Sequence, residues 1–341
     1  MSETLVAPNA TGAGPRRTER LSGRSPLRRF LIRPEAGSLL GALAVFALFY
    51  AMAPTFRQAD AMSTILYQAS ILGIVATGVA LLMIGGEFDL SAGVGVIASA
   101  LFAGMFAFQF STNVWVAVAL ALVFSLSIGF LNGWLLIKTG LPSFLVTLST
   151  FLMLQGANIA VTKLVSGTVA TNNIEDMDGF TQVKAVFAST FHVFDFRVSV
   201  TIVWWLALIA VATWVLLRTK VGNWIYAVGG DKDAARAVGV PVKRVKIGLF
   251  MAVGLCAWVA GMHQLASFGR IQSGEGVGNE LLYIMAAVVG GCLLTGGYGT
   301  AIGAAIGALI YGMSRQGIVY AGWDNNWLMF FVGLMLLIAT V

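Results

Sequence analysis

The chain contains the apolar run Thr64–Ile84, TILYQASILGIVATGVALLMI, which passes directly into Gly85–Gly93, GGEFDLSAG. The run has 21 residues and no charged side chain. A helix needs about 20 apolar residues to cross the hydrocarbon core of a bilayer. Glycines permit a sharp backbone turn after the run. Glu87 and Asp89 follow this turn, so the stretch predicts a membrane-spanning helix that ends in a polar, glycine-rich break.

Asp89 has two interpretations. It can cap the helix that begins with the next apolar run, because an aspartate there accepts hydrogen bonds from free backbone N–H groups. It can also take part in transport chemistry, since carboxylates within membrane segments are rare and often functional. Its place at the start of an apolar run favours the structural role.

The composition extends this interpretation to the whole chain. Of its 341 residues, 58% are hydrophobic and 11% are charged. Soluble globular domains have about 45–50% apolar and about 25% charged residues, so a water-soluble globular protein is excluded. We predict an all-α polytopic membrane protein with about ten transmembrane helices and glycine-rich breaks. The eighth of ten apolar runs is short, and can either span the membrane fully or re-enter. The runs are Gly37–Ala53, Thr64–Ile84, Val94–Phe110, Val114–Ile137, Pro142–Thr162, Val198–Leu217, Val245–Ala266, Leu281–Leu294, Thr300–Val319 and Trp327–Val341.

The basic residues predict the topology. Residues 1–36 carry seven arginines among glycine, proline and serine, which predicts a disordered arm, and residues 37–341 would form one transmembrane domain. With the arm in the cytoplasm, ten spans place the basic stretch of about 218–246 on the same side and the more acidic loop 163–197 outside, in agreement with the positive-inside rule. The net charge of +6 therefore reflects topology and not a nucleic-acid partner.

The inventory of reactive residues argues against an enzyme. No G-x-x-x-x-G-K-[ST] phosphate-binding motif occurs, and His192 and His263 have no metal-ligand spacing. Cys256 and Cys292 both lie inside apolar runs, where buried thiols are common. We expect no catalytic residue, no metal site and no cofactor in this chain. Any ATP and Mg²⁺ would be used by a partner.

A second break and a short polar helix complete the pattern. Gly290–Thr300, GGCLLTGGYGT, separates the eighth and ninth runs and contains Gly296 and Gly297. In Gly229–Pro241, GGDKDAARAVGVP, Asp231 is a candidate N-cap, and the glycine and proline near the end are stop signals. A helix of two turns is marginal in water, so either the membrane surface or another protein must hold it. Its alanines suit a protein groove better than lipid.

Four segments resemble one family, the permease subunits of bacterial ABC importers for ribose, xylose, arabinose and similar monosaccharides. The segments are Gly86–Ser91 (GEFDLS), Gly140–Leu148 (GLPSFLVTL), Ile225–Val245 (beginning IYAVGG) and Glu280–Thr300 (beginning EL). The resemblance covers Ala59–Val341. The sequence departs from the family at Glu87, Leu282 and Arg315, where glycine, aspartate and asparagine are frequent, so the substrate can differ from ribose. Arg315 should face the bundle interior or extend towards the membrane surface.

The resemblance implies the fold of an ABC importer permease in a bacterial inner membrane, with a cytoplasmic N-terminus. It also implies a cytoplasmic ATPase, a periplasmic sugar-binding protein and a second permease copy, most simply in a homodimer. The short helix would then couple the permease to the ATPase. Its residues are Asp231, Lys232, Asp233, Ala234, Ala235, Arg236, Val238 and Gly239.

Polar residues within the runs have two interpretations. They can contact a sugar along the pathway, or they can form hydrogen bonds between helices, since both tasks use the same residue types. Phe144 can stack on a sugar ring or simply pack. Outside the membrane, Lys184, Arg197 and Arg270 can pair with acids on the binding protein or remain solvated. The pathway candidates are Gln68, Asn132, Phe144, Gln155 and Asn158.

Two alternatives remain for the function. A related importer could carry nucleosides, branched-chain amino acids or a sugar-derived signal. An ion-coupled secondary carrier could instead work alone, but such a carrier has no need of a docked cytoplasmic helix.

Overall fold

The computed structural model describes residues 34–193 and 196–340, and this part of the chain is helical apart from one small hairpin and the connecting loops. Most of the predicted basic arm lies outside the described residues, and helix α2 begins at Pro34, inside the segment predicted as arm. The elements are α2 (Pro34–Met52), η1 (Pro54–Arg57), α3 (Ala59–Ile84), α4 (Ala92–Phe110), α5 (Val114–Thr139), α6 (Ser143–Ser166), α7 (Phe180–Phe187), β1 (Thr190–Val193), β2 (Phe196–Ser199), α8 (Val200–Arg218), α9 (Lys220–Gly230), α10 (Lys232–Ala237), α11 (Val242–Phe268), α12 (Asn279–Val289), α13 (Ala301–Tyr320) and α14 (Trp327–Thr340).

Ten of these helices correspond to the ten apolar runs. Eight are long and apolar enough to cross a membrane, whereas α12 and α14 are shorter. The 11 residues of α12 rise by about 16 Å, roughly half of a hydrocarbon core of about 30 Å. The eighth run is therefore a broken segment, in which a half-length helix is followed by the second glycine-rich break.

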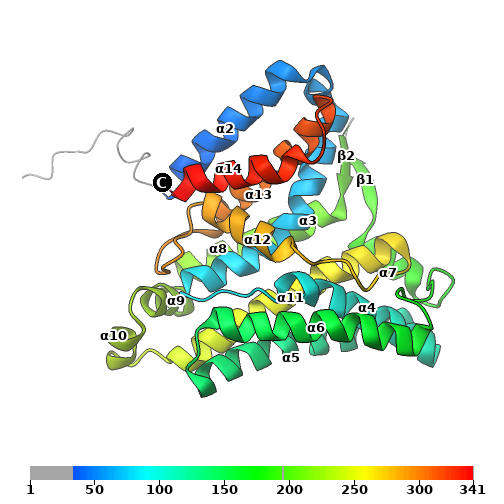
Figure 1. The fold of residues 1–341 in the computed structure, drawn as a ribbon, viewed down its shortest axis with the longest axis horizontal. Coiled ribbons are helices and arrows are strands. Elements are labelled where there is room, and N and C mark those ends of the chain that lie inside the picture. Colours follow the sequence, from blue (N-terminus) through cyan, green and yellow to red (C-terminus); the bar gives the residue numbers. More distant parts are fainter. Residues whose placement is uncertain (1–33, 194–195, 341) are drawn as a thin grey trace, which may run out of the picture. The chain divides into compact units, whose positions relative to one another are not determined.

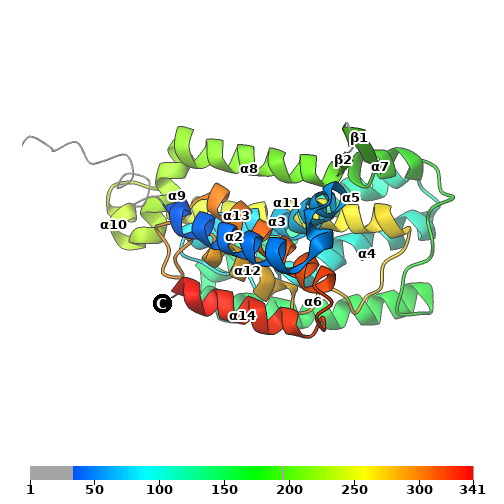
Figure 2. The ribbon, with the colours of Figure 1, turned by 90° about the horizontal axis from the view of Figure 1, so that it is seen from above.

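The long helices run between two ends of the bundle. Helices α9 and α10 lie at one end, which we name the α10 end, and α7 with the β1–β2 hairpin lies at the other, the hairpin end (Figure 1). Helices α3, α5 and α8 lead to the α10 end, and α6 and α11 lead away from it. Seen from above, α8 lies along one side of the bundle, while α6 and α14 lie along the opposite side (Figure 2).

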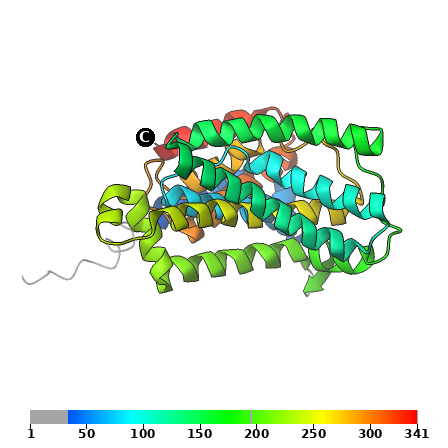
Figure 3. The same cartoon turned by 90° about the horizontal axis from the view of Figure 1, so that it is seen from below.

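Helix α11 is central and packs against α3, α4 and α5. Its contact with α5 depends on small residues, because a Cβ at Gly254 would lie 2.6 Å from the Ser125 carbonyl oxygen. The Ser125 hydroxyl donates to the Gly254 carbonyl at 2.7 Å. Membrane helices approach this closely only where side chains are small. In the view from below, α5 crosses obliquely over α11 (Figure 3).

Candidate functional site

The first break, residues 85–91, leaves α3 at the α10 end and returns into the bundle before α4 begins. Gly86 makes the turn with a φ of +81°, a conformation that favours glycine. Irregular backbone at membrane depth requires protein partners for its polar groups. Helix α6 supplies them, because the N–H of Phe88 donates to the Ser143 hydroxyl and the N–H of Leu90 to the Thr147 hydroxyl, both at 3.1 Å.

Helices α5 and α6 together hold the start of α4, with Asn132 on α5 and both Thr150 and Asn158 on α6. The Asn132 amide donates to the Ser91 hydroxyl at 2.9 Å and accepts from the Thr150 hydroxyl at 2.7 Å. About two helical turns after Thr150 on α6, the Asn158 amide donates to the Val94 carbonyl at 3.2 Å. Both asparagines are buried. Of the two interpretations that the sequence left open, the geometry matches the interhelical hydrogen bond for Asn132 and Asn158.

Asp89 does not cap α4 directly, so that prediction is wrong in detail. Its Oδ1 accepts from the backbone N–H of Ser91 at 2.8 Å and from the Ser91 hydroxyl at 2.6 Å. Helix α4 begins at Ala92, and Ser91 makes no side-chain capping bond. Asp89 lies two residues before this cap position, where an aspartate closes an Asx turn on its own backbone. It thus shapes the turn that leads into α4.

A buried ion pair joins the break to α11. The Lys246 ammonium contacts a carboxylate oxygen of Glu87, and the two residues are 7% and 8% exposed. In the sequence, Lys246 ends the basic stretch of about 218–246. It lies 159 positions from Glu87, so no local pattern pairs the two residues. A usable signal was present in the sequence. An acid inside a membrane break needs a cation, and Lys246 is the basic residue that enters the apolar part of α11.

Three segments meet through glycines at the α10 end. A Cβ at Gly229 of α9 would clash with the Ile84 carbonyl and lie 2.6 Å from the Gly297 nitrogen. A Cβ at Gly296 would lie 2.6 Å from the Gly86 Cα, and the Gly297 N–H donates to the Ile84 carbonyl at 2.8 Å. We name Gly86, Gly229, Gly296 and Gly297 the glycine junction. It brings both breaks and α9 into backbone contact.

A side chain reinforces the junction. The Tyr226 hydroxyl of α9 donates to the Gly299 carbonyl of the second break at 2.9 Å. Burial raises the pKa of Tyr226 above its ordinary value, so the hydroxyl keeps its proton for this bond. Helix α9 is therefore fixed to both breaks by backbone packing and by one hydrogen bond.

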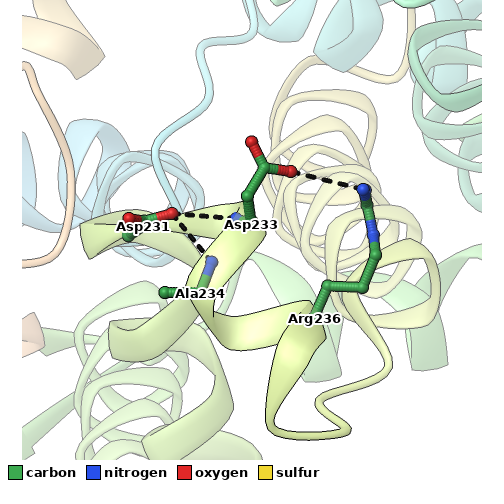
Figure 4. Close-up of polar contacts among 4 residues, drawn as sticks. All are labelled: Asp231, Asp233, Ala234 and Arg236. Atoms are coloured by element: carbon green, nitrogen blue, oxygen red, sulfur yellow. Dashed lines mark hydrogen bonds and ion pairs between the residues drawn. The ribbon is translucent and has the colours of Figure 1, made fainter.

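Helix α10 follows directly and is almost entirely exposed. Asp231 is its N-cap, as predicted, and its carboxylate accepts from the N–H groups of Asp233 and Ala234, both at 2.9 Å (Figure 4). These bonds hold the pKa of Asp231 below its ordinary value, first the bond from Ala234 and then that from Asp233. Arg236 pairs with Asp233 at 3.3 Å.

The exposed residues from Asp231 to Gly239 form a surface that we name the knob. Ala235 is the one buried residue from Asp231 to Gly239, where Gly239 turns the chain with a φ of +86°. Val238 is 80% exposed. An apolar side chain this exposed, on a helix too short to be stable alone, fits an element that a protein partner covers.

A cavity of about 940 Å³ lies between α10, the first break and the loop before α6. It is lined by the Glu87–Lys246 pair, by Thr295 of the second break and by Phe144. Of the pathway candidates, Phe144 thus faces an open space. Gln68 and Gln155 are half-buried on α3 and α6.

The hairpin end has a second, polar cavity of about 330 Å³. Two of the three basic candidates, Lys184 and Arg197, line it. His263 lies at its wall, where Nδ1 donates to the Phe187 carbonyl at 2.8 Å and Nε2 therefore accepts from the Tyr67 hydroxyl at 3.1 Å. Arg270 is exposed in the segment that precedes α12.

Arg315 is also exposed on α13, and its guanidinium donates to the Tyr311 hydroxyl at 3.4 Å. The Arg315 side chain therefore does not face the interior of the bundle.

Comparison with known proteins places these features in a family. Residues 61–340 match the family described as branched-chain amino acid transport system / permease component. The ribose import permease protein RbsC of Escherichia coli (strain K12) is 31% identical over 330 residues, covering 95% of this chain and 98% of that protein. The fructose import permease protein FrcC of Rhizobium meliloti is 30% identical over 297 residues, covering 87% and 81%.

A third relative is named for the import of a different substrate. The autoinducer 2 import system permease protein LsrC of Enterobacter sp. (strain 638) is 29% identical over 317 residues, covering 91% of this chain and 87% of that protein. No solved structure matches the chain. The match over residues 61–340 and the relatives of nearly equal length show that the chain belongs to the family of permease components of the branched-chain amino acid transport system type.

Proposed function

We propose that this chain is the membrane permease of an ATP-driven importer in a bacterial inner membrane, and that its substrate is a monosaccharide or a closely related polyhydroxylated solute. In this proposal the α10 end and the N-terminus face the cytoplasm. The partners are an ATPase that uses ATP and Mg²⁺, a periplasmic binding protein, a second permease copy and the surrounding lipid. The substrate class follows the relatives, whose names specify import of ribose, fructose and autoinducer 2.

The glycine junction is the observation that carries the proposal. An exposed helix that docks on an ATPase must transmit movement to the pathway. Helix α9 carries α10 and contacts the backbone of both breaks without an intervening side chain. Because packed interfaces do not deform continuously, a displacement of α10 would shift the breaks rather than be absorbed between them.

Each end of the bundle has a cavity suited to its proposed role. The cavity at the α10 end would be the inner mouth of the pathway, where Phe144 offers a flat apolar surface to a sugar ring. At the hairpin end, Lys184 and Arg197 would attract acidic side chains of the binding protein. Charges at the rim of an interface mainly steer association and orientation.

Reconstitution tests the function. The permease is placed in liposomes with its ATPase, and ATP turnover is measured with a panel of binding proteins, each loaded with one monosaccharide. We expect one loaded binding protein to stimulate ATP turnover and to drive uptake of its sugar. If the permease alone moved sugar along an ion gradient, while ATP turnover ignored it, the secondary-carrier alternative would replace the proposal.

A substitution in the knob tests the docking role. Val238→Asp places a charge on the exposed tip of α10 without disturbing buried packing. We expect stimulated ATP turnover to fall at least tenfold, with unchanged membrane insertion and unchanged elution from a sizing column. Full stimulation by the Val238→Asp variant would exclude α10 as the ATPase-docking element.

A further inference from the structure

Helix α8 is flanked by an apolar groove on each side. The first groove lies between α8 and α11 over a floor of α3, and its volume is about 280 Å³. Gly248 of α11 keeps it open, because no atom lies within 4 Å of the Cβ that another residue would add there. Arg244 lies at the α10 end of this groove and is the charged residue among its lining side chains.

The second groove follows α8, which supplies all of its lining residues except Ile302 of α13, and has a volume of about 390 Å³. Its walls include Leu206, Trp214 and Ile302, and it too ends in one arginine, Arg218, at the last turn of α8. Both arginines are exposed. The same arrangement therefore occurs twice, with an apolar groove along the helices and a guanidinium at the α10 end.

We propose that the two grooves beside α8 each bind one acyl chain of an anionic phospholipid, whose phosphate is held by Arg244 or Arg218. Arginine pairs with phosphate through a planar fork of N–H donors. Basic residues between transmembrane helices near the membrane surface recognise anionic head groups in this way. An amphiphile with an anionic head satisfies both the apolar walls and the terminal arginine.

The length of the first groove fits one leaflet. From Arg244 to Leu255, both in its lining, α11 rises by about 16 Å over eleven residues. One leaflet contributes about 15 Å to a hydrocarbon core of about 30 Å. An acyl chain whose head group lies at Arg244 would therefore fill the groove from end to end.

The groove is too narrow to take up a whole helix of a second copy. A volume of about 280 Å³ spread over about 16 Å corresponds to a cross-section of about 17 Å². A helix with side chains is about 10–12 Å across and presents about 80 Å² or more. The space admits a single hydrocarbon chain and not a helix.

The chain offers a matched control beside the first groove. Lys243 is next to Arg244 in sequence, carries the same charge and is also exposed, but it lines the cavity at the α10 end instead of the groove. Gly333 of α14 is a second control, because it is a glycine with equally open surroundings on another helix. Folding of each variant is checked by circular dichroism and elution volume.

Native mass spectrometry of the full chain, titrated separately with phosphatidylglycerol and phosphatidylcholine, tests the inference. We expect the wild type to retain phosphatidylglycerol in preference to phosphatidylcholine. Arg244→Gln and Arg218→Gln should each weaken the affinity for one of the two bound phosphatidylglycerol molecules about fivefold, which corresponds to about 1 kcal/mol per basic residue. Gly248→Leu should lower retention of both lipids by filling the groove, while Lys243→Gln and Gly333→Leu should match the wild type.

Three results would overturn the inference. These are equal retention of the two lipids by the wild type, equal losses for Lys243→Gln and Arg244→Gln, and loss of a dimer species instead of lipid in Gly248→Leu. None of these readouts depends on transport, so the lipid sites can fail while the proposed function stands.

Discussion

Glu87 and Lys246 make a first prediction at the scale of single residues. Removing one member of a buried ion pair leaves an uncompensated charge and costs about 3–5 kcal/mol, whereas replacing both with apolar residues is often neutral. We therefore expect Glu87→Leu and Lys246→Met each to lower the thermal midpoint of the purified permease, and the double variant Glu87→Leu/Lys246→Met to recover most of the loss. Additive losses in the double variant would show that the two side chains stabilise the protein independently.

Asp231 makes a second prediction, in which pH is the variable. Its pKa lies below the ordinary 3.8, so the cap stabilises α10 above that pH and is lost as the pH falls through the lowered pKa. Asparagine caps without a charge. At neutral pH we expect faster amide exchange in residues 232–238 for Asp231→Ala than for the wild type or Asp231→Asn. As the pH falls below 3.8, the wild type should approach Asp231→Ala, after correction for intrinsic exchange, while Asp231→Asn should not change.

At the scale of elements, local signals and long-range contacts differ in how far the sequence predicts them. The Asp231 cap could be predicted, because its partners lie two and three residues away. The half-length of α12 followed from the shortness of its run. The roles of Asn132 and Asn158 could not be chosen, because residue type gives a capacity for hydrogen bonds but not the direction in which a helix face points. Only the packing of α5 and α6 against residues 91–94 decides it.

The contact between α9 and the two breaks provides a third prediction, with neighbouring glycines as variant and control. Gly229→Ala places a methyl group against the Ile84 carbonyl, whereas a Cβ at Gly230 meets no atom within 4 Å. Both positions lie in α9, so the change in helix propensity is the same. We expect Gly229→Ala to reduce sugar-stimulated uptake at least tenfold and Gly230→Ala to leave it within about twofold of the wild type.

The reason is geometric, because the junction has no flexible side chain that could move aside. Uptake and ATP turnover are measured together in the liposome assay. Equal activity of the two variants would contradict a role of the backbone contact in coupling. A loss of ATP turnover in parallel with uptake would place the defect at the permease–ATPase contact, whereas turnover without uptake would place it between α9 and the breaks.

At the scale of the whole molecule, both breaks and α9 meet at one end, and the polar hairpin cavity lies at the other. This polarity has a functional meaning only if the two ends face different sides of the membrane. The proposal assigns the α10 end to the cytoplasm, as the clustering of basic residues there predicts. An inverted arrangement would place α10 where no ATPase exists, so the orientation is a test of the entire scheme.

Cysteine accessibility measures this orientation. The native Cys256 and Cys292 are 4% and 2% exposed, so they should not react with a membrane-impermeant maleimide and no background removal is needed. Val238→Cys of α10 and Phe191→Cys of the hairpin replace side chains that are 80% and 41% exposed. In intact spheroplasts we expect labelling of Phe191→Cys alone, and in inside-out vesicles labelling of Val238→Cys alone. The reverse pattern would refute the cytoplasmic assignment of α10, and with it the docking of an ATPase there.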